Sequence, residues 1–118
     1  MSKHQIIHVE LSSRDHEEAG QFYHELFGWE IRQIPEMSYA TFSTGGVGGG
    51  FNPVSEGNPA GTVLIYISTD DIDRDLLRAE QLGGKAVQPK MEIPGVGWFA
   101  LFSDPTVNRV ALFTPNEM

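Results

Sequence analysis

Two side chains with acid–base chemistry stand two residues apart near the start of the sequence. From Ile6 to Leu11 apolar and polar residues alternate, which predicts a strand with one face in a core. His8 and Glu10 fall on the polar face, so we expect their side chains to project side by side. This pair could bind a ligand or transfer a proton, or the two groups could only satisfy each other's hydrogen bonds. The spacing leaves both interpretations open.

A helix and three extended segments follow this strand. Apolar residues recur at three- and four-residue steps from His16 to Phe27, which predicts an amphipathic helix. Ser13 or Asp15 can cap its amino end, and Gly28 can end it with a positive φ. The extended segments span residues 30–34, 37–43 and 47–51. The glycine-rich stretch 44–50 lacks the Gly-Lys-Ser/Thr ending of a phosphate loop, so we interpret it as a hairpin and a thin strand.

The same order of elements recurs in the second half of the sequence. A linker over residues 54–61 leads to a predicted strand at 62–68 and a helix carrying Ile72, Leu76, Leu77 and Leu82 on one side. Three further strands are predicted at 85–88, 97–103 and 108–114. At an offset of 56 residues, Val9 aligns with Ile65 and Asp15 with Asp71, which indicates an internal duplication.

The duplication predicts an α+β fold in a single domain over residues 1–118. Two tandem modules, about 5–53 and 62–114, would each form half of a cup-shaped sheet with its helix on the outer face. The residues predicted to line the cup are His8, Glu10, Thr62, Leu64, Tyr66, Arg109, Ala111 and Phe113.

Two further side chains have more than one possible role. Trp98 follows a Pro-Gly turn and would be either a core residue or a lid over an apolar ligand. Arg109 would be solvated at a strand end, pair with Glu10, or bind an anionic ligand. The direction of both side chains is left open by the sequence.

Composition limits the classes of partner. The 118 residues carry a net charge of −8, which disfavours nucleic acid and anionic membranes as partners. They include no cysteine, which is typical of a cytoplasmic protein. The longest apolar run, residues 63–67, is far too short to span a bilayer. The first five residues, 1–5, carry no hydrophobic secretion segment.

Several short motifs together resemble one known family. They are Ile7–Leu11 with Asp15, Phe22-Tyr23, Leu26–Trp29, Leu82–Lys85, Ile93–Gly97 and Phe102–Pro105. With these motifs the chain resembles, over residues 5–114, the vicinal oxygen chelate superfamily of glyoxalase I, bleomycin-resistance proteins and extradiol dioxygenases. It looks most like the small glyoxalase-like proteins related to lactoylglutathione lyase. Val107 stands where the family usually has glycine, and we expect Asn108 to take the positive φ instead.

The resemblance implies a place for a divalent ion, held by His, Glu or Gln at four equivalent strand positions. His8 matches the first position. The second falls on Leu64, the last on Ala111, and the remaining one near Gly49, Gly50 or Phe51, none of which offers a ligating side chain. We therefore predict no metal centre of the family type, and no other cofactor.

Three functional hypotheses follow from these residues and the resemblance. The first is a metal-free protein that binds a small molecule in its cup, as bleomycin-resistance proteins do. The second is an enzyme, a lactoylglutathione-lyase-related lyase or isomerase or a dioxygenase-like protein, with His8 and Glu10 as acid and base, either without a metal or with a divalent metal held unconventionally. The third is an inert module whose cup is filled by its own side chains. In each case the resemblance implies a homodimer.

Overall fold

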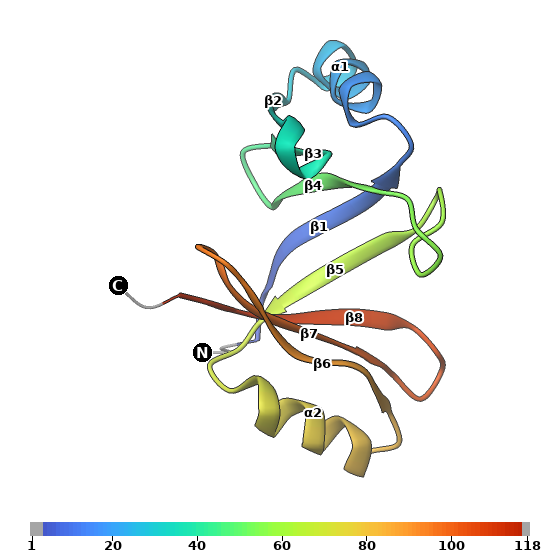
Figure 1. Cartoon of the computed structure of the whole chain (residues 1–118), viewed down its shortest axis with the longest axis vertical. Helices are drawn as coiled ribbons and strands as arrows, with labels where there is room; N and C mark the ends of the chain where they lie inside the picture. Colours follow the sequence, from blue (N-terminus) through green and yellow to red (C-terminus); the bar gives the residue numbers. More distant parts are fainter. Residues whose placement is uncertain (1–3, 117–118) are drawn as a thin grey trace. The chain divides into compact units, whose positions relative to one another are not determined.

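The protein is described by a computed structural model that covers residues 4–116. These residues form two compact units, one of residues 7–64 and one of residues 65–116 with residues 4–6. In each unit one helix lies against a four-stranded sheet (Figure 1). The order strand, helix, three strands occurs in both units, so the predicted α+β class and the repeated pattern are confirmed.

The first unit places its amino-terminal strand at one edge of its four strands. Its elements are β1 (Ile6–Ser13), α1 (His16–Phe27), β2 (Glu30–Ile34), a short 3-10 helix (Pro35–Met37), β3 (Tyr39–Ser43) and β4 (Gly48–Pro53). The strand order is β2-β3-β4-β1. β1 runs parallel to β4, and the other pairs are antiparallel.

The second unit repeats this arrangement. Its elements are β5 (Val63–Ser68), α2 (Ile72–Gln81), β6 (Lys85–Ile93), β7 (Gly97–Ser103) and β8 (Arg109–Pro115). The order is β5-β8-β7-β6, with β5 parallel to β8. β6 continues past the predicted 85–88 because it pairs with β7 as far as Ile93. The ladder shifts register between Ala86 and Gln88 and again between Gln88 and Met91, and Pro89 lies within the second shift.

The two helices begin in the same way and end differently. The Asp15 carboxylate accepts hydrogen bonds from the Glu17 and Glu18 amides, and Asp71 caps α2 through the Arg74 amide. α1 ends at Gly28 with a φ of 77°, as predicted. In α2 the positive φ falls on Gly83, one residue before the position that the offset of 56 pairs with Gly28.

Each unit has its own core between helix and sheet. In the first, Ala40, Phe42 and Phe51 are buried, and the rings of Tyr23, Trp29 and Phe42 stack in sequence with centroids 5.2 and 4.8 Å apart. In the second, the buried cluster consists of Ile72, Leu76, Ala100 and Leu112. Leu11 and Ile67 pack against these clusters, so both face the helix side.

The prediction for α2 was wrong at two positions. Leu77 and Leu82 were expected on the buried side with Ile72 and Leu76, but they are 60% and 63% exposed. A ten-residue helix offers a narrow contact stripe, and Ile72 and Leu76, four residues apart, occupy it.

The turn before β8 also differs from expectation. Val107 itself adopts a φ of 75°, and Asn108 does not take the positive-φ role. The Asn108 amide and side chain instead donate to the Asp104 carboxylate. The left-handed conformation thus falls one residue before the expected position.

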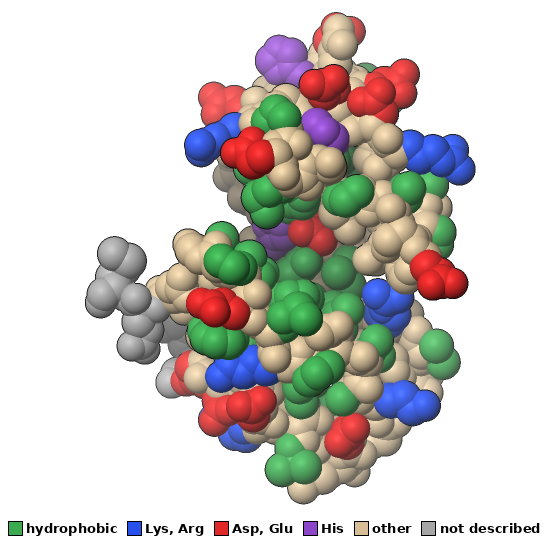
Figure 2. All heavy atoms as spheres, viewed as in Figure 1, with side chains coloured by type: hydrophobic (Ala, Val, Ile, Leu, Met, Phe, Trp, Pro, Cys, Tyr) green, Lys and Arg blue, Asp and Glu red, His purple; other side chains and the backbone are tan. Residues whose placement is uncertain are grey.

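The described surface carries an excess of acidic groups. Red acidic side chains are spread over the visible surface (Figure 2), in keeping with 16 acidic against 8 basic residues in the chain. Within residues 4–116, neither helix has the length and apolar content needed to cross a bilayer. The predicted absence of a secretion segment concerns residues 1–5, of which 1–3 lie outside the described residues.

Candidate functional site

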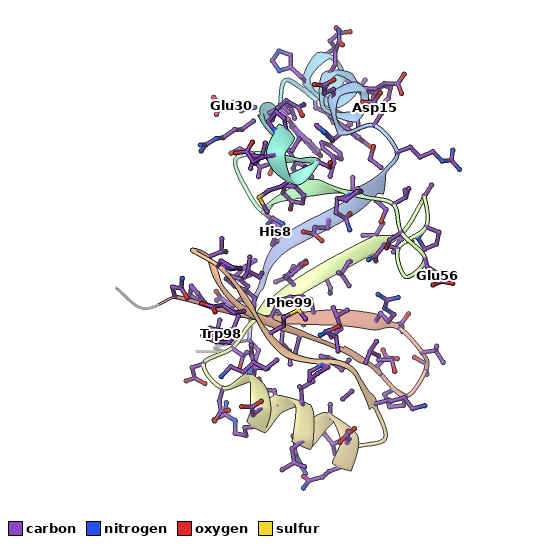
Figure 3. All side chains as sticks on the ribbon, in the orientation of Figure 1. His8, Asp15, Glu30, Glu56, Trp98 and Phe99 are labelled. Carbon is purple, nitrogen blue, oxygen red and sulfur yellow. The ribbon has the colours of Figure 1, made fainter. Side chains whose placement is uncertain are left out.

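Residues that point away from the helix in the first unit form one polar surface. Leu11, Phe42 and Phe51 pack on the helix side, so residues one step away on the same strands lie on the opposite face. This surface, here called the helix-free face, carries His8 and Glu10 on β1, Tyr39 on β3 and Gly50 on β4. Figure 3 labels His8 on β1.

His8, Tyr39 and Glu10 form one hydrogen-bonded cluster on the helix-free face. The Tyr39 hydroxyl donates to Glu10 Oε2 at 2.9 Å, and His8 Nε2 lies 2.9 Å from the same hydroxyl oxygen. Since the single phenolic proton goes to Glu10, this arrangement assigns the Nε2 proton to His8 as donor. His8 Nε2 and Glu10 Oε2 are 3.7 Å apart, so the predicted pair is brought together through a tyrosine.

Tyr39 reaches β1 by crossing over β4, which lies between them in the sheet. A Cβ atom at Gly50 would stand 2.0 Å from the Tyr39 hydroxyl oxygen and 2.2 Å from Cζ. Any side chain at position 50 would therefore displace the phenol ring. The glycines of β4 thus create the space in which the cluster assembles.

The cluster is partly shielded from solvent. The side chains of Glu10 and His8 are 13% and 31% exposed. A carboxylate at this depth is stabilised by the hydrogen bond that it accepts from Tyr39. The three groups can bind a polar group of a ligand, and their hydrogen bonds form a continuous path for a proton.

The second unit holds the remaining predicted lining residues, apart from Leu64 and the half-buried Thr62, which both belong to residues 7–64. Leu64 is buried at the start of β5. Tyr66 pairs with Ala111 in the register of β5 and β8, while the next pair, Ile67 with Leu112, faces α2. Tyr66, Arg109, Ala111 and Phe113 therefore share the face of this unit's sheet that points away from α2. Their contact with a ligand stays a prediction.

Trp98 points toward the helix side of its own unit. It packs against the cluster of Ile72, Leu76, Ala100 and Leu112, and Lys90 Nζ lies 5.1 Å from its ring centroid. Of the two roles left open by the sequence, the structure shows packing on the core. Phe99, the next residue on β7, pairs with Phe113 of β8. Both therefore lie on the face of the sheet that points away from α2, and Figure 3 labels Phe99 beside Trp98.

The donor set does not fit the four-ligand metal centre that the family resemblance implies. Leu64 and Ala111 are buried and carry no donor atom. The third non-matching position is occupied by glycines, and the Tyr39 hydroxyl fills the space beside Gly50. Within residues 4–116, no three His, Cys, Asp or Glu side chains are grouped to hold an ion. We therefore derive no chemical step through a metal.

Tyr39 and Gly50 are site residues that sequence reasoning missed. The signal for Tyr39 was present, because it alternates with the buried Ala40 and Phe42 and must share a face with the β1 polar row. The glycine-rich stretch was interpreted as a thin strand, and at Gly50 the group that approaches the backbone closely is the phenol ring of Tyr39 from the neighbouring β3.

A family model matches nearly the whole chain, and two curated proteins are similar in sequence. The family model "Glyoxalase/Bleomycin resistance protein/Dioxygenase superfamily" matches residues 5–112. The chain is 31% identical to "Putative glyoxylase CFP32" of Mycobacterium bovis and 29% identical to "Anthracycline biosynthesis protein DnrV" of Streptomyces peucetius. Each match covers 92% of this chain but only 45% and 46% of the relative, so the chain spans less than half of their length.

A solved structure extends this agreement to the fold. The methylmalonyl-CoA epimerase of Mycobacterium tuberculosis superposes with a TM-score of 0.70 at 15% identity, covering 95% of this chain and 88% of the epimerase. At that identity the likeness concerns the fold alone. With the family model matching nearly the whole chain, the protein belongs to the glyoxalase/bleomycin resistance protein/dioxygenase superfamily.

Proposed function

We propose that this chain binds a small organic molecule on the helix-free face of residues 7–64, without a metal centre of the family type. The observation that carries the proposal is the cluster of His8, Tyr39 and Glu10, joined by two hydrogen bonds of 2.9 Å. A few fixed polar groups next to apolar surface are typical of small-molecule sites. The mismatch at Leu64 and Ala111 favours binding over metal-assisted glyoxalase chemistry.

The ligand would be recognised by acceptor and donor groups at fixed positions. The Glu10 carboxylate accepts hydrogen bonds, which suits a hydroxyl or ammonium group on the ligand. The net charge of −8 supports the same preference for neutral or cationic molecules over anions at this face. Tyr66, Arg109, Ala111 and Phe113 are proposed as ligand contacts on the second unit's own sheet, on the face that points away from α2.

Thermal-shift screening with single-ring aromatic compounds, neutral and cationic, tests this proposal. A ligand at about 100 times its Kd stabilises the folded protein by about 2.7 kcal/mol, which gives a clear rise in Tm. Tyr39→Phe keeps the ring over Gly50 and removes only the hydroxyl, so it should weaken binding by about fivefold to tenfold. His8→Ala should weaken it as well.

Tyr23→Phe is the matched control, because it removes a hydroxyl from the helix-side cluster of the same unit. It should leave ligand affinity unchanged. If no compound raises the Tm, or if Tyr23→Phe and Tyr39→Phe weaken binding equally, the proposed site is wrong. The inert-module hypothesis then takes its place.

A second candidate is acid–base catalysis by the same groups, a lyase or isomerase reaction. The continuous path from Glu10 through Tyr39 to His8 favours it, because such a path lets one residue take a proton while another returns one. One neighbour of the same fold is named an epimerase. Solvent deuterium entering the carbon next to the carbonyl of an acyl thioester, followed by NMR, would indicate this activity. If the thioester binds but no deuterium enters it, the catalytic proposal is wrong and only the binding function remains.

The assembly proposed for this chain is a homodimer in the cytoplasm. The amino-acid composition without cysteine supports the location. Phe22, Leu26 and Phe27 are more than half exposed on α1, and apolar side chains grouped on one helix suit a contact between copies.

A further inference from the structure

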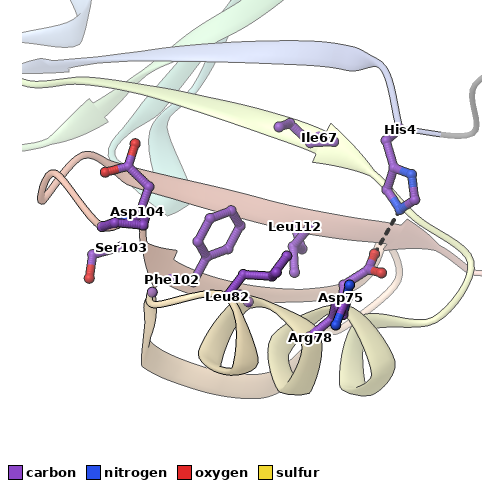
Figure 4. A pocket seen from close by; sticks show the side chains of 12 residues that line it. His4, Ile67, Asp75, Arg78, Leu82, Phe102, Ser103, Asp104 and Leu112 are labelled. Carbon is purple, nitrogen blue, oxygen red and sulfur yellow. Dashed lines mark hydrogen bonds and ion pairs between the residues drawn. The ribbon is translucent and has the colours of Figure 1, made fainter.

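A cavity opens in the second unit, on the side of the sheet that α2 covers. Its volume is about 370 Å³, and it lies between α2 and the strands β5, β7 and β8 (Figure 4). α2 packs mainly on β6, β7 and β8, so the space between the helix and β5 is left open. The cavity is separate from the helix-free face, which belongs to residues 7–64.

The middle of the cavity is apolar. Ile67 on β5, Phe102 on β7 and Leu112 on β8 form its floor, and Leu82 at the end of α2 forms part of its mouth (Figure 4). Leu112 belongs to the buried cluster of this unit, and Phe102 and Ile67 pack against that cluster. The floor is therefore held in place by the core, and α2 contributes Arg78 and Ala79 to the lining.

The two acidic groups at the cavity are already engaged. Asp75 Oδ2 lies 2.9 Å from His4 Nε2 and also accepts a hydrogen bond from the Thr69 hydroxyl. The Asp104 carboxylate accepts bonds from Thr106 and Asn108 in its own turn. Neither carboxylate is therefore available as the main contact for a cationic ligand.

The arginine at the cavity has no acidic partner among residues 4–116. Arg78 donates to the Gln81 side-chain oxygen at 3.3 Å, and no carboxylate of residues 4–116 lies within 4.0 Å of its guanidinium. Arg74, one turn earlier on α2, is by contrast paired with Asp70 and Asp75. A guanidinium left without a carboxylate beside an apolar cavity is suited to the head of an amphipathic anion.

We propose that this cavity binds a medium-chain carboxylic acid. The alkyl chain lies on Ile67, Phe102 and Leu112, and the carboxylate meets Arg78. The volume falls at the lower end of the range for small-molecule sites, which suits a single short chain. This site is independent of the His8 cluster and of the function proposed for it.

Titration with sodium octanoate, followed by amide chemical shifts in ¹H–¹⁵N NMR spectra, tests the proposal. The expected result is a saturable shift at α2, β7 and β8 that leaves β1 and β3 unchanged. 1-Octanol and octylammonium, of the same chain length, should bind about threefold to fivefold more weakly, because an exposed charge pair contributes at most about 1 kcal/mol. Equal or tighter binding of octylammonium would overturn the assignment of Arg78.

Two variants separate the charge from the cavity. Arg78→Gln should remove the preference for octanoate over 1-octanol, whereas Arg74→Gln, on the same helix, should keep it. Ala79→Leu adds volume at the cavity lining and should abolish binding of all three probes. Both arginines are exposed, so the Arg78→Gln result does not depend on a change in the core. The same preference in both arginine variants, or no saturable shift in the natural protein, rules the site out.

Discussion

Val107 carries a backbone conformation that a β-branched residue rarely adopts. Its φ is 75° and its side chain is 81% exposed, so packing does not stabilise this conformation. The hydrogen bonds around it do. The Asp104 carboxylate accepts from the Thr106 and Asn108 amides at 2.8 and 2.9 Å, and the Asp104 amide donates to the Asn108 carbonyl at 2.8 Å. The turn imposes the strain on the residue between them.

Val107→Gly should raise the stability of the protein. The left-handed conformation costs a non-glycine residue roughly 1–2 kcal/mol, part of which is offset by the greater freedom of glycine in the unfolded chain. We expect a net gain of about 1 kcal/mol in urea unfolding, or a rise of about 4 °C in Tm. Val96→Gly is the control, since Val96 is exposed and its φ is not positive. If Val107→Gly is no more stable than the natural protein, the backbone at Val107 is not strained.

Asp104 predicts how this turn responds to acid. The hydrogen bonds from Asn108, followed by those from Thr106, lower the pKa of the Asp104 carboxyl from 3.8 to about 2. A lowered pKa contributes stability that is complete above the unfolded value and is lost as the pH falls toward the folded one. The urea concentration at the unfolding midpoint should therefore decrease as the pH is lowered from about 4 to about 2.

Asp104→Asn should flatten the pH dependence in that window and lower the midpoint at neutral pH. Glu56→Gln, in the linker between the modules, is the control that leaves the turn intact. If the urea midpoint depends on pH in the same way for Asp104→Asn and for the natural protein from pH 4 to pH 2, the turn does not hold the Asp104 carboxyl ionised.

At the level of elements, β4 shapes the candidate site by the side chains that it lacks. The strand lies between β3 and β1 and carries glycine at positions 48–50. At Gly49 an added Cβ would lie 1.9 Å from the Val9 carbonyl oxygen, so there the backbones themselves approach closely. At Gly50 the obstructing group is the Tyr39 side chain. The two glycines are needed for different reasons.

A double-mutant cycle separates these reasons. Gly50→Ala should destabilise the protein by about 1–3 kcal/mol, because the methyl group overlaps the phenol ring. In a Tyr39→Ala background the cost should largely disappear, giving a coupling energy above about 1 kcal/mol. Gly49→Ala should remain destabilising in both backgrounds. Additive effects of Gly50→Ala and Tyr39→Ala in urea unfolding would show that the ring does not require this glycine.

On the scale of the whole molecule, the chain consists of one module repeated. Both units have a strand, a helix capped by aspartate and three further strands, and each has its own core. The two units share the fold, but the second unit does not repeat the His8 position of the first unit's cluster. The strand position of His8 in the first unit corresponds to the buried Leu64 at the offset of 56 residues.

The proposed homodimer predicts a solution mass of about twice the 13.1 kDa of one chain in light scattering. Replacing Phe22 and Leu26 together by Glu places charges on the exposed side of α1 and should give the mass of one chain. Leu77→Glu, at an exposed leucine of α2, should leave the dimer unchanged. A natural protein that stays at the mass of one chain at the highest concentration reached would disprove the dimer.

Much of the fold could be read from local patterns. Alternation predicted β1, three- and four-residue steps predicted α1, and Asp15 and Gly28 marked its ends. These features depend on residues that are close together in the chain, so they can be predicted from the spacing of residue types. The exposure of Leu77 and the left-handed Val107 did not follow, because helix docking and turn hydrogen bonds decide them.

The sequence by itself determined the repeated α+β modules, the family, and the placement of His8 beside Glu10 on one strand face. Only the tertiary structure decided that Tyr39 joins them, because residues 29 and 31 positions apart meet only after β3, β4 and β1 are aligned. It also decided that Trp98 turns to the core and that Arg78 lies at a cavity. Side-chain direction depends on which strands pair and how a helix docks, and these are contacts between distant parts of the chain.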